Sequence, residues 1–148
     1  MSKYSDRAIE LFKEGKNCSQ AVFVAFAPDL GVPEDVALSI SVGLGGGVGR
    51  MREVCGAVSG SAMLVGLKYP EFDKMQVYEK VREIIDEFKK TNYSIVCKEL
   101  LGLTEVEKSS IPEARTPEYY QKRPCVQIVE DAALAVEKIL FSEGNIAI

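Results

Sequence analysis

Four cysteines are the residues of this sequence with the most distinctive chemistry: Cys18, Cys55, Cys97 and Cys125. A cysteine thiolate can act as a nucleophile in redox chemistry or as a ligand of zinc or iron. No Cys-x-x-Cys pair occurs, so the spacing is neither that of a thioredoxin-type motif nor that of a zinc ribbon. A shared site would require four distant segments to converge. The alternative is that each cysteine is a small buried hydrophobe.

The absence of histidine excludes many kinds of site. The chain contains neither histidine nor tryptophan. Ser-His-Asp and Cys-His catalysis, mixed Cys/His zinc sites and histidine-ligated haem all need an imidazole. The haem attachment motif Cys-x-x-Cys-His is also absent. Chemistry based on sulfur alone is what remains for the four cysteines.

Apolar periodicity and capping residues predict an all-α fold that must position these cysteines. Neither a strand pattern nor an internal repeat is evident, and residues 103–123 have the composition of a long connection. We therefore expect a single-domain bundle of about six to seven helices over residues 1–148. The expected helices are 5–14 with Ser5 as its cap, 18–27 with Asn17 as its cap, one opened by Pro33, 55–67, 71–90, 94–101 and 124–141.

The predicted helices place Cys18, Cys55 and Cys125 in first turns, each in phase with an apolar stripe. Cys97 falls about one turn into its helix. Unpaired N–H groups and the helix dipole stabilise a thiolate at a helix start. We therefore expect inward-facing cysteines with lowered pKa values. Cys55 is expected to be the most exposed to a partner, because the adjacent glycines leave room.

Six glycines lie between Gly43 and Gly56, a density that predicts a tight loop rather than a helix interior. The run fits neither the dinucleotide-binding fingerprint nor the P-loop pattern. Close backbone approach near Cys55 is the simpler interpretation, with Gly47 and Gly56 as candidate cofactor contacts. Arg50 and Arg52 could stabilise a thiolate or an anionic cluster, or could simply be solvated.

Length and composition indicate an ordinary globular protein. The chain has 148 residues, of which 47% are hydrophobic and 27% charged, with a formal net charge of −4. An acidic balance argues against a nucleic-acid partner. No apolar run of about 18 residues occurs and no signal core follows the first lysine, so neither a membrane span nor a leader is expected. We expect a cytoplasmic protein, whose thiols stay reduced.

The order of these motifs resembles a known family. The sequence has Cys18, then a glycine-rich run that leads into Cys55-Gly56-Ala57-Val58-Ser59-Gly60, and then Cys97 and Cys125. This order is similar to that of the redox-active family named for its cysteine pattern, C_GCAxxG_C_C. The likeness covers roughly residues 15–140, and Val54 stands where the family name has glycine. It implies an all-helical fold and a redox role for all four cysteines. The chain also resembles the cysteine-bearing part of split-Soret cytochromes, which implies an iron–sulfur cluster.

The leading hypothesis is a redox protein whose four cysteines cycle between dithiol and disulfide or ligate an iron–sulfur cluster. Its partner would be a redox protein, a small thiol or an electron carrier. Two alternatives remain open: a zinc-holding module without turnover, and a helical interaction protein whose cysteines are structural. The small-residue helix that follows Cys55 could serve a homodimer as easily as a core.

Overall fold

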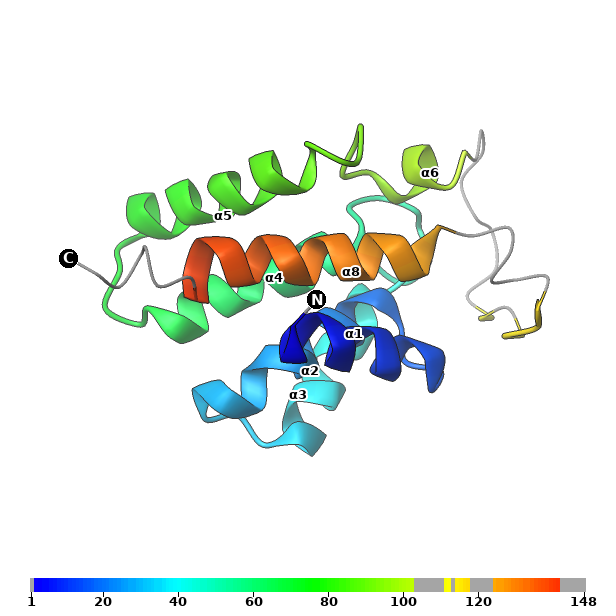
Figure 1. The fold of residues 1–148 in the computed structure, drawn as a ribbon, viewed down its shortest axis with the longest axis horizontal. Helices are drawn as coiled ribbons and strands as arrows, with labels where there is room; N and C mark the ends of the chain where they lie inside the picture. Colours follow the sequence, from blue (N-terminus) through cyan, green and yellow to red (C-terminus); the bar gives the residue numbers. More distant parts are fainter. Residues whose placement is uncertain (1, 103–110, 113, 118–123, 142–148) are drawn as a thin grey trace.

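Seven α-helices make up the computed structural model, which describes residues 2–102, 111–112, 114–117 and 124–141 (Figure 1). Short 3₁₀ turns follow the second and third helices, and a π-helical turn over Glu137–Phe141 ends the last one. The all-α prediction is confirmed. The α-helices are α1 (Lys3–Lys13), α2 (Cys18–Phe26), α3 (Glu34–Ser41), α4 (Gly56–Lys68), α5 (Lys74–Phe88), α6 (Cys97–Leu100) and α8 (Cys125–Val136).

Reciprocal capping fixes where the helices begin. The Asn17 side chain accepts from the backbone N–H of Gln20 at 2.9 Å, and the Gln20 side chain accepts from the Asn17 N–H, which confirms Asn17 as the cap of α2. The prediction for α1 was wrong by one turn. Ser2 caps this helix, and Ser5 is the buried partner that closes the capping box.

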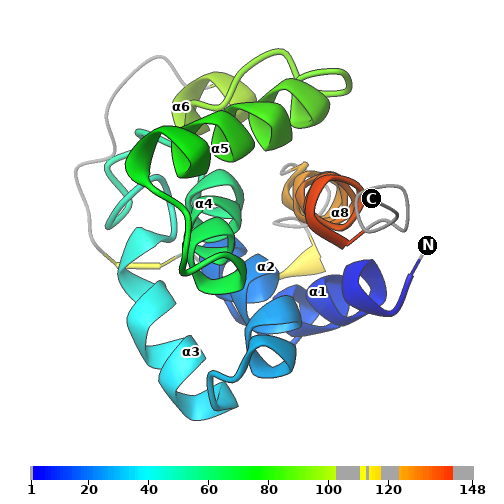
Figure 2. The same ribbon diagram turned by 90° about the vertical axis from the view of Figure 1, so that its left-hand side faces the viewer.

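Helix α2 is the centre of the bundle. Seven of its nine residues are buried, so its surface is apolar nearly all round. It packs against α1, α3, α4 and α8, and Figure 2 shows it between these helices. Phe12, Phe26 and Phe88 are the largest fully buried side chains of the surrounding core. Each such side chain stabilises the fold by roughly 1.5–3 kcal/mol.

Helix α4 approaches α2 backbone to backbone, through its glycines. A Cβ on Gly56 would lie 3.0 Å from the amide nitrogen of Ser19, and one on Gly60 would lie 2.8 Å from the Ser19 carbonyl oxygen. The small residues after Cys55 thus permit close helix packing within one chain. A homodimer, the other use considered for this helix, stays a prediction.

A short antiparallel contact changes the predicted boundary of α6. Val54 and Val96 form an isolated β-bridge, and the N–H of Cys97 donates to the carbonyl of Glu53. Because the backbone at Val96 is extended, α6 begins at Cys97, which is its first residue and does not lie one turn inside it.

Most of the expected connection over 103–123 lies outside the described residues. Within the described residues, no helix combines the length and the apolar character that crossing a membrane requires.

Candidate functional site

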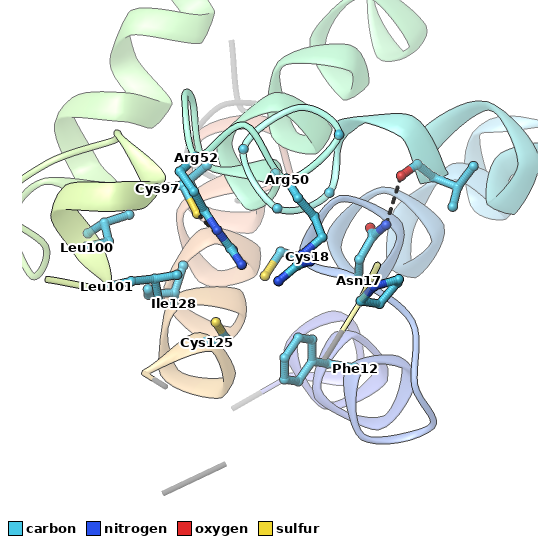
Figure 3. Close-up of a pocket in the computed structure, with 18 of the residues that line it drawn as sticks. Phe12, Asn17, Cys18, Arg50, Arg52, Cys97, Leu100, Leu101, Cys125 and Ile128 are labelled. Atoms are coloured by element: carbon cyan, nitrogen blue, oxygen red, sulfur yellow. Dashed lines mark hydrogen bonds between the residues drawn. The ribbon is translucent and has the colours of Figure 1, made fainter. Parts of the chain in front are cut away.

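The four cysteines line one cavity of about 290 Å³ (Figure 3). The starts of α2, α4, α6 and α8 gather at one end of the bundle, at the right in Figure 1. The volume is at the lower end of the ~300–1,000 Å³ typical of small-molecule sites. The structure therefore brings together four residues that are far apart in the sequence.

Each cysteine sits at the N-terminal boundary of a helix. Cys18, Cys97 and Cys125 are the first residues of their helices, and Cys55 is the N-cap of α4. Two links hold these starts together. The Asn17 amide donates to the carbonyl of Val42 at 2.9 Å, which ties the start of α2 to the glycine-rich loop. The N–H of Cys55 donates to the carbonyl of Ile95 at 2.7 Å, which holds Cys55 beside the start of α6.

Cys18 and Cys125 line the cavity from the starts of α2 and α8, and their thiols interact. The neighbouring Cys125 thiol raises the pKa of Cys18 well above its ordinary value, and burial adds to the rise. Cys18 as a residue is partly exposed, while its thiol is directed into the protein. Neither sulfur forms a disulfide in this structure. The raised pKa means that Cys18 keeps its proton.

Cys55 differs from the sequence-based expectation in two respects. It is 4% exposed, and the adjacent Gly56 packs against the backbone of Ser19 in α2, so the glycine leaves no open space for a partner. Its pKa is raised to about 12, chiefly by burial, although the N–H groups of Ala57 and Val58 oppose the rise. The prediction of a lowered pKa at this helix start is wrong, since desolvation outweighs the helix N-terminus.

Cys97 lies beside a cation. The Arg52 guanidinium donates to the Cys97 sulfur at 3.7 Å, and both side chains are buried. A guanidinium next to sulfur favours the thiolate over the thiol. Of the two roles considered for Arg52, thiolate stabilisation fits this contact. The alternative, a solvated side chain, is wrong because Arg52 is only 7% exposed.

The glycine-rich loop is a left-handed turn. Five consecutive residues, from Gly46 to Arg50, have φ between 58° and 73°. A β-branched residue is rarely found there, yet Val48 has φ 66°. The carbonyls of Gly46 and Gly47 accept from the N–H groups of Arg52 and Glu53, which closes the turn. The loop thereby directs Arg50 and Arg52 toward the cysteines (Figure 3).

Gly47 and Gly56, the predicted cofactor contacts, both line the cavity. Each also has a packing reason to be glycine. A Cβ on Gly47 would lie 2.5 Å from the amide nitrogen of Glu53, and Gly56 packs on α2. Their role toward a cofactor stays a prediction.

Several other residues that line the cavity were not predicted as site residues. Arg115 lies in the segment expected to be a plain connection, and its guanidinium donates to the carbonyls of Phe12 and Lys16, both at 2.9 Å. It also stacks over the Phe12 ring, with 4.3 Å to the centroid. The apolar part of the cavity wall is formed by Phe12, Leu100, Leu101, Pro112 and Ile128.

The donor set has the ligand count of an iron–sulfur cluster. Four thiols surround one buried cavity, and two arginines could balance the charge of a thiolate-ligated cluster. Within the described residues, no group of three or more cysteine or acidic side chains is close enough together to hold one ion. Four thiols are the usual ligand set of an iron–sulfur cluster, so the donor atoms present fit that group in number and kind.

Comparison with known proteins assigns the chain to a family. The family model described as "Putative redox-active protein (C_GCAxxG_C_C)" matches residues 16–139. An "Uncharacterized protein" of Archaeoglobus fulgidus is 31% identical over 147 residues, which cover 88% of this chain and 88% of the relative. No solved structure matches. The chain belongs to the C_GCAxxG_C_C family of redox-active proteins.

Proposed function

We propose that the protein is a thiol–disulfide redox protein whose reactive pair is Cys18 and Cys125. The observation that carries the proposal is that the Cys18 and Cys125 thiols interact with each other across the starts of α2 and α8, because disulfide formation requires two sulfurs close together. Both thiols line the shared cavity, and Cys18 is the cysteine with partial exposure. A substrate disulfide entering the cavity would therefore meet this pair.

The proposed reaction begins at Cys125, because the raised pKa of Cys18 leaves its neighbour as the more readily ionised thiol of the pair. The Cys125 thiolate attacks a substrate disulfide, forms a mixed disulfide and releases the first substrate thiolate. Cys18 then attacks the Cys125 sulfur, and its proton passes to the second departing thiolate. The first departing thiolate takes up the proton that Cys125 lost. Two protein thiols become one disulfide as one substrate disulfide becomes two thiols.

Cys55 and Cys97 have supporting roles in this proposal. Cys55 keeps its proton at neutral pH because burial raises its pKa to about 12. Cys97 lies against Arg52, which favours its thiolate. The β-bridge between Val54 and Val96 holds the two chain segments together. Neither sulfur takes part in the exchange at Cys18 and Cys125.

The test is the oxidation of reduced protein by a small disulfide under anaerobic conditions, with release of substrate thiol as the readout. Wild type is expected to release two thiols for each disulfide formed. Cys125→Ser is expected to abolish the reaction, and Cys18→Ser to stop it at the mixed disulfide. Cys55→Ser is the matched control, expected to retain both steps. Native thiols that remain unreactive in wild type would contradict the proposal.

An iron–sulfur protein is the second candidate, favoured by the presence of all four cysteines around one cavity. Cys18, Cys55, Cys97 and Cys125 would hold the cluster, which would supply one-electron transfer. Anaerobic purification separates the two candidates. Brown protein with visible absorbance supports the cluster, and colourless metal-free protein with a reactive thiol pair supports the dithiol. Colourless protein with one tightly bound zinc would contradict both.

The proposed partners follow from the chemistry. A disulfide-bearing substrate oxidises the pair, and a reduced thiol or electron carrier must restore it. We place this cycle in the cytoplasm, where the thiol pool keeps cysteines reduced.

A further inference from the structure

A segment from far along the chain covers the cysteine cavity. We call it the strap and define it as the described residues 111–112 and 114–117. Two of its residues, Pro112 and Arg115, line the cavity. All of its residues except Arg115 are exposed, and Ile111 is 74% exposed. The strap therefore lies between the cavity and the solvent.

Two arginines attach the strap to the body of the protein. The Arg50 guanidinium, in the glycine-rich loop, donates to the carbonyl of Ile111. Arg115 donates to the carbonyls of Phe12 and Lys16 at the end of α1, both at 2.9 Å. Its guanidinium also lies over the Phe12 ring. Arg50 and Phe12 both line the cavity, so the strap runs between two elements of the cavity wall.

The strap is attached to the bundle without being part of its core. None of the strap residues belongs to the hydrophobic core or to the apolar residues packed against it. Segments with few buried apolar contacts open at a small fraction of the free energy that global unfolding requires. The strap can therefore be displaced while the helices that carry the cysteines stay folded.

The reactive sulfurs lie inside the cavity that the strap covers. Cys125 is 8% exposed, and the Cys18 thiol is directed into the protein. Figure 3 shows Phe12, Leu101 and Ile128 around these two cysteines, and all of them line the same cavity. A thiolate attacks a disulfide only by contact with one of its sulfurs. The substrate must therefore bring its sulfurs into the cavity.

The cavity is too small for the disulfide of a folded protein. In such a disulfide the two Cα atoms are only ~4.4–6.8 Å apart, so two stretches of backbone accompany the sulfurs wherever they go. The cavity has a volume of about 290 Å³, at the lower end of the range for small-molecule sites. It has room for a small molecule and not for two peptide segments.

We infer that the substrate is a small-molecule disulfide, and that the strap excludes larger disulfides from the site. This inference rests on the proposed dithiol function. The small disulfide enters beside the strap and meets Cys125 and then Cys18. The reaction is the balanced exchange given above, with the small disulfide as oxidant and two small thiols as products.

The test compares three disulfides of increasing size. Bis(2-hydroxyethyl) disulfide is small and uncharged, the disulfide of N-acetylcysteine amide is larger and uncharged, and insulin carries its disulfides within a folded protein. Second-order rate constants for oxidation of Cys18 and Cys125 in the reduced full chain come from trapping and peptide mass spectrometry. They are divided by the rate constants of dithiothreitol with the same disulfides, which removes differences in intrinsic reactivity. The smallest disulfide is expected to react at least ~100-fold faster than insulin, with the intermediate one between them, because access limits the exchange.

Two variants test the role of the strap. Arg115→Gln removes the guanidinium that holds the strap to α1, and Arg50→Gln removes the one that donates to Ile111. Each is expected to raise the normalised rate of the intermediate disulfide several-fold and that of the smallest one less, which narrows the ratio between them. Arg82→Gln removes an exposed arginine of α5 and is expected to retain the ratio of wild type. Circular dichroism checks that each variant keeps its helices.

Equal normalised rates for insulin and the smallest disulfide would overturn this inference and leave the dithiol function standing. A ratio of the two uncharged disulfides that neither strap variant changes would also overturn it, because the strap would then exclude nothing. If none of the three disulfides oxidises the wild-type pair, the dithiol function fails and the inference fails with it.

Discussion

Gly60 of α4 faces the carbonyl oxygen of Ser19 in α2, so closely that a Cβ on Gly60 would lie 2.8 Å from that oxygen. Both residues of this contact are close in sequence to a cysteine of the cavity. Ser19 follows Cys18, and Gly60 is just over one turn beyond Cys55. The distance between two cysteine-bearing helices is thus set by a residue without a side chain.

Gly60→Ala is expected to lower the free energy of unfolding by about 1–3 kcal/mol, because the new methyl group must push α4 away from α2. Gly66→Ala in the same helix is the matched control. A Cβ there meets nothing within 4 Å. Since alanine is the better helix former, that variant is expected to gain up to ~1 kcal/mol. Denaturant unfolding measures both, and equal effects of the two substitutions would contradict the close-packing account.

Val48→Gly is expected to stabilise the protein. Val48 has φ 66° and is 43% exposed, so glycine relieves strain with little loss of packing. The relief is about 1–2 kcal/mol, partly offset by the freedom that glycine adds to the unfolded chain.

The control for Val48→Gly is Val36→Gly in α3, where the residue is 44% exposed and helical. The unfolded-state effect is the same in both variants, so their difference reports the strain. Val36→Gly is expected to destabilise by a few tenths of a kcal/mol. A Val48→Gly variant no more stable than Val36→Gly would show that the turn at Val48 is unstrained.

Stability is expected to fall in alkaline solution because of Cys55. Its pKa is raised to about 12 in the folded protein, against about 8.5 for a free thiol. Below about 8.5 both states are protonated and the contribution of Cys55 to stability is fully present. As pH rises from there toward 12, only the unfolded state ionises, and stability falls by on the order of 1 kcal/mol per pH unit.

The measurement is the free energy of unfolding of Cys55→Ser and of wild type across this range, with reductant present. The serine variant is expected to lose less stability than wild type above pH about 8.5. Parallel curves for the two proteins would mean that Cys55 is not the titrating group.

Arg52→Gln is expected to slow alkylation of Cys97 by several fold near neutral pH. The guanidinium that donates to this sulfur at 3.7 Å favours the reactive thiolate, and glutamine carries no charge. Peptide mass spectrometry after timed iodoacetamide treatment gives the rate at Cys97 alone. Arg82→Gln, on the exposed face of α5, is expected to leave that rate unchanged. A faster reaction of Cys97 in Arg52→Gln would show that Arg52 shields this sulfur and does not activate it.

The sequence predicted those features that depend on neighbouring residues. Asn17 was recognised as a cap because its partner, Gln20, is three residues away. The small residues around Gly60 indicated close packing of this helix, but not that α2 is the helix packed against it. The start of α6 was missed because Val96 pairs with Val54, a contact between segments that sequence periodicity does not report.

The site itself depended on tertiary contacts. Pattern and family resemblance singled out the four cysteines, but spacing could not show that Cys18 meets Cys125. The exposure of Cys55 was predicted wrongly because the adjacent Gly56 admits the backbone of α2 and not a partner. Its pKa was predicted in the wrong direction for the same reason, since burial outweighs the helix start. Arg115 was not anticipated, because its contacts are with α1, about a hundred positions earlier in the chain.

The most direct test of the central claim is to map the disulfide that forms when reduced protein is oxidised anaerobically by a small disulfide. The protein is trapped with iodoacetamide, digested without reductant and analysed by mass spectrometry. The account predicts that a peptide linking Cys18 to Cys125 forms first, while Cys55 is recovered alkylated after denaturation. A first linkage that excludes Cys18 or Cys125, or full recovery of all four thiols, would contradict it.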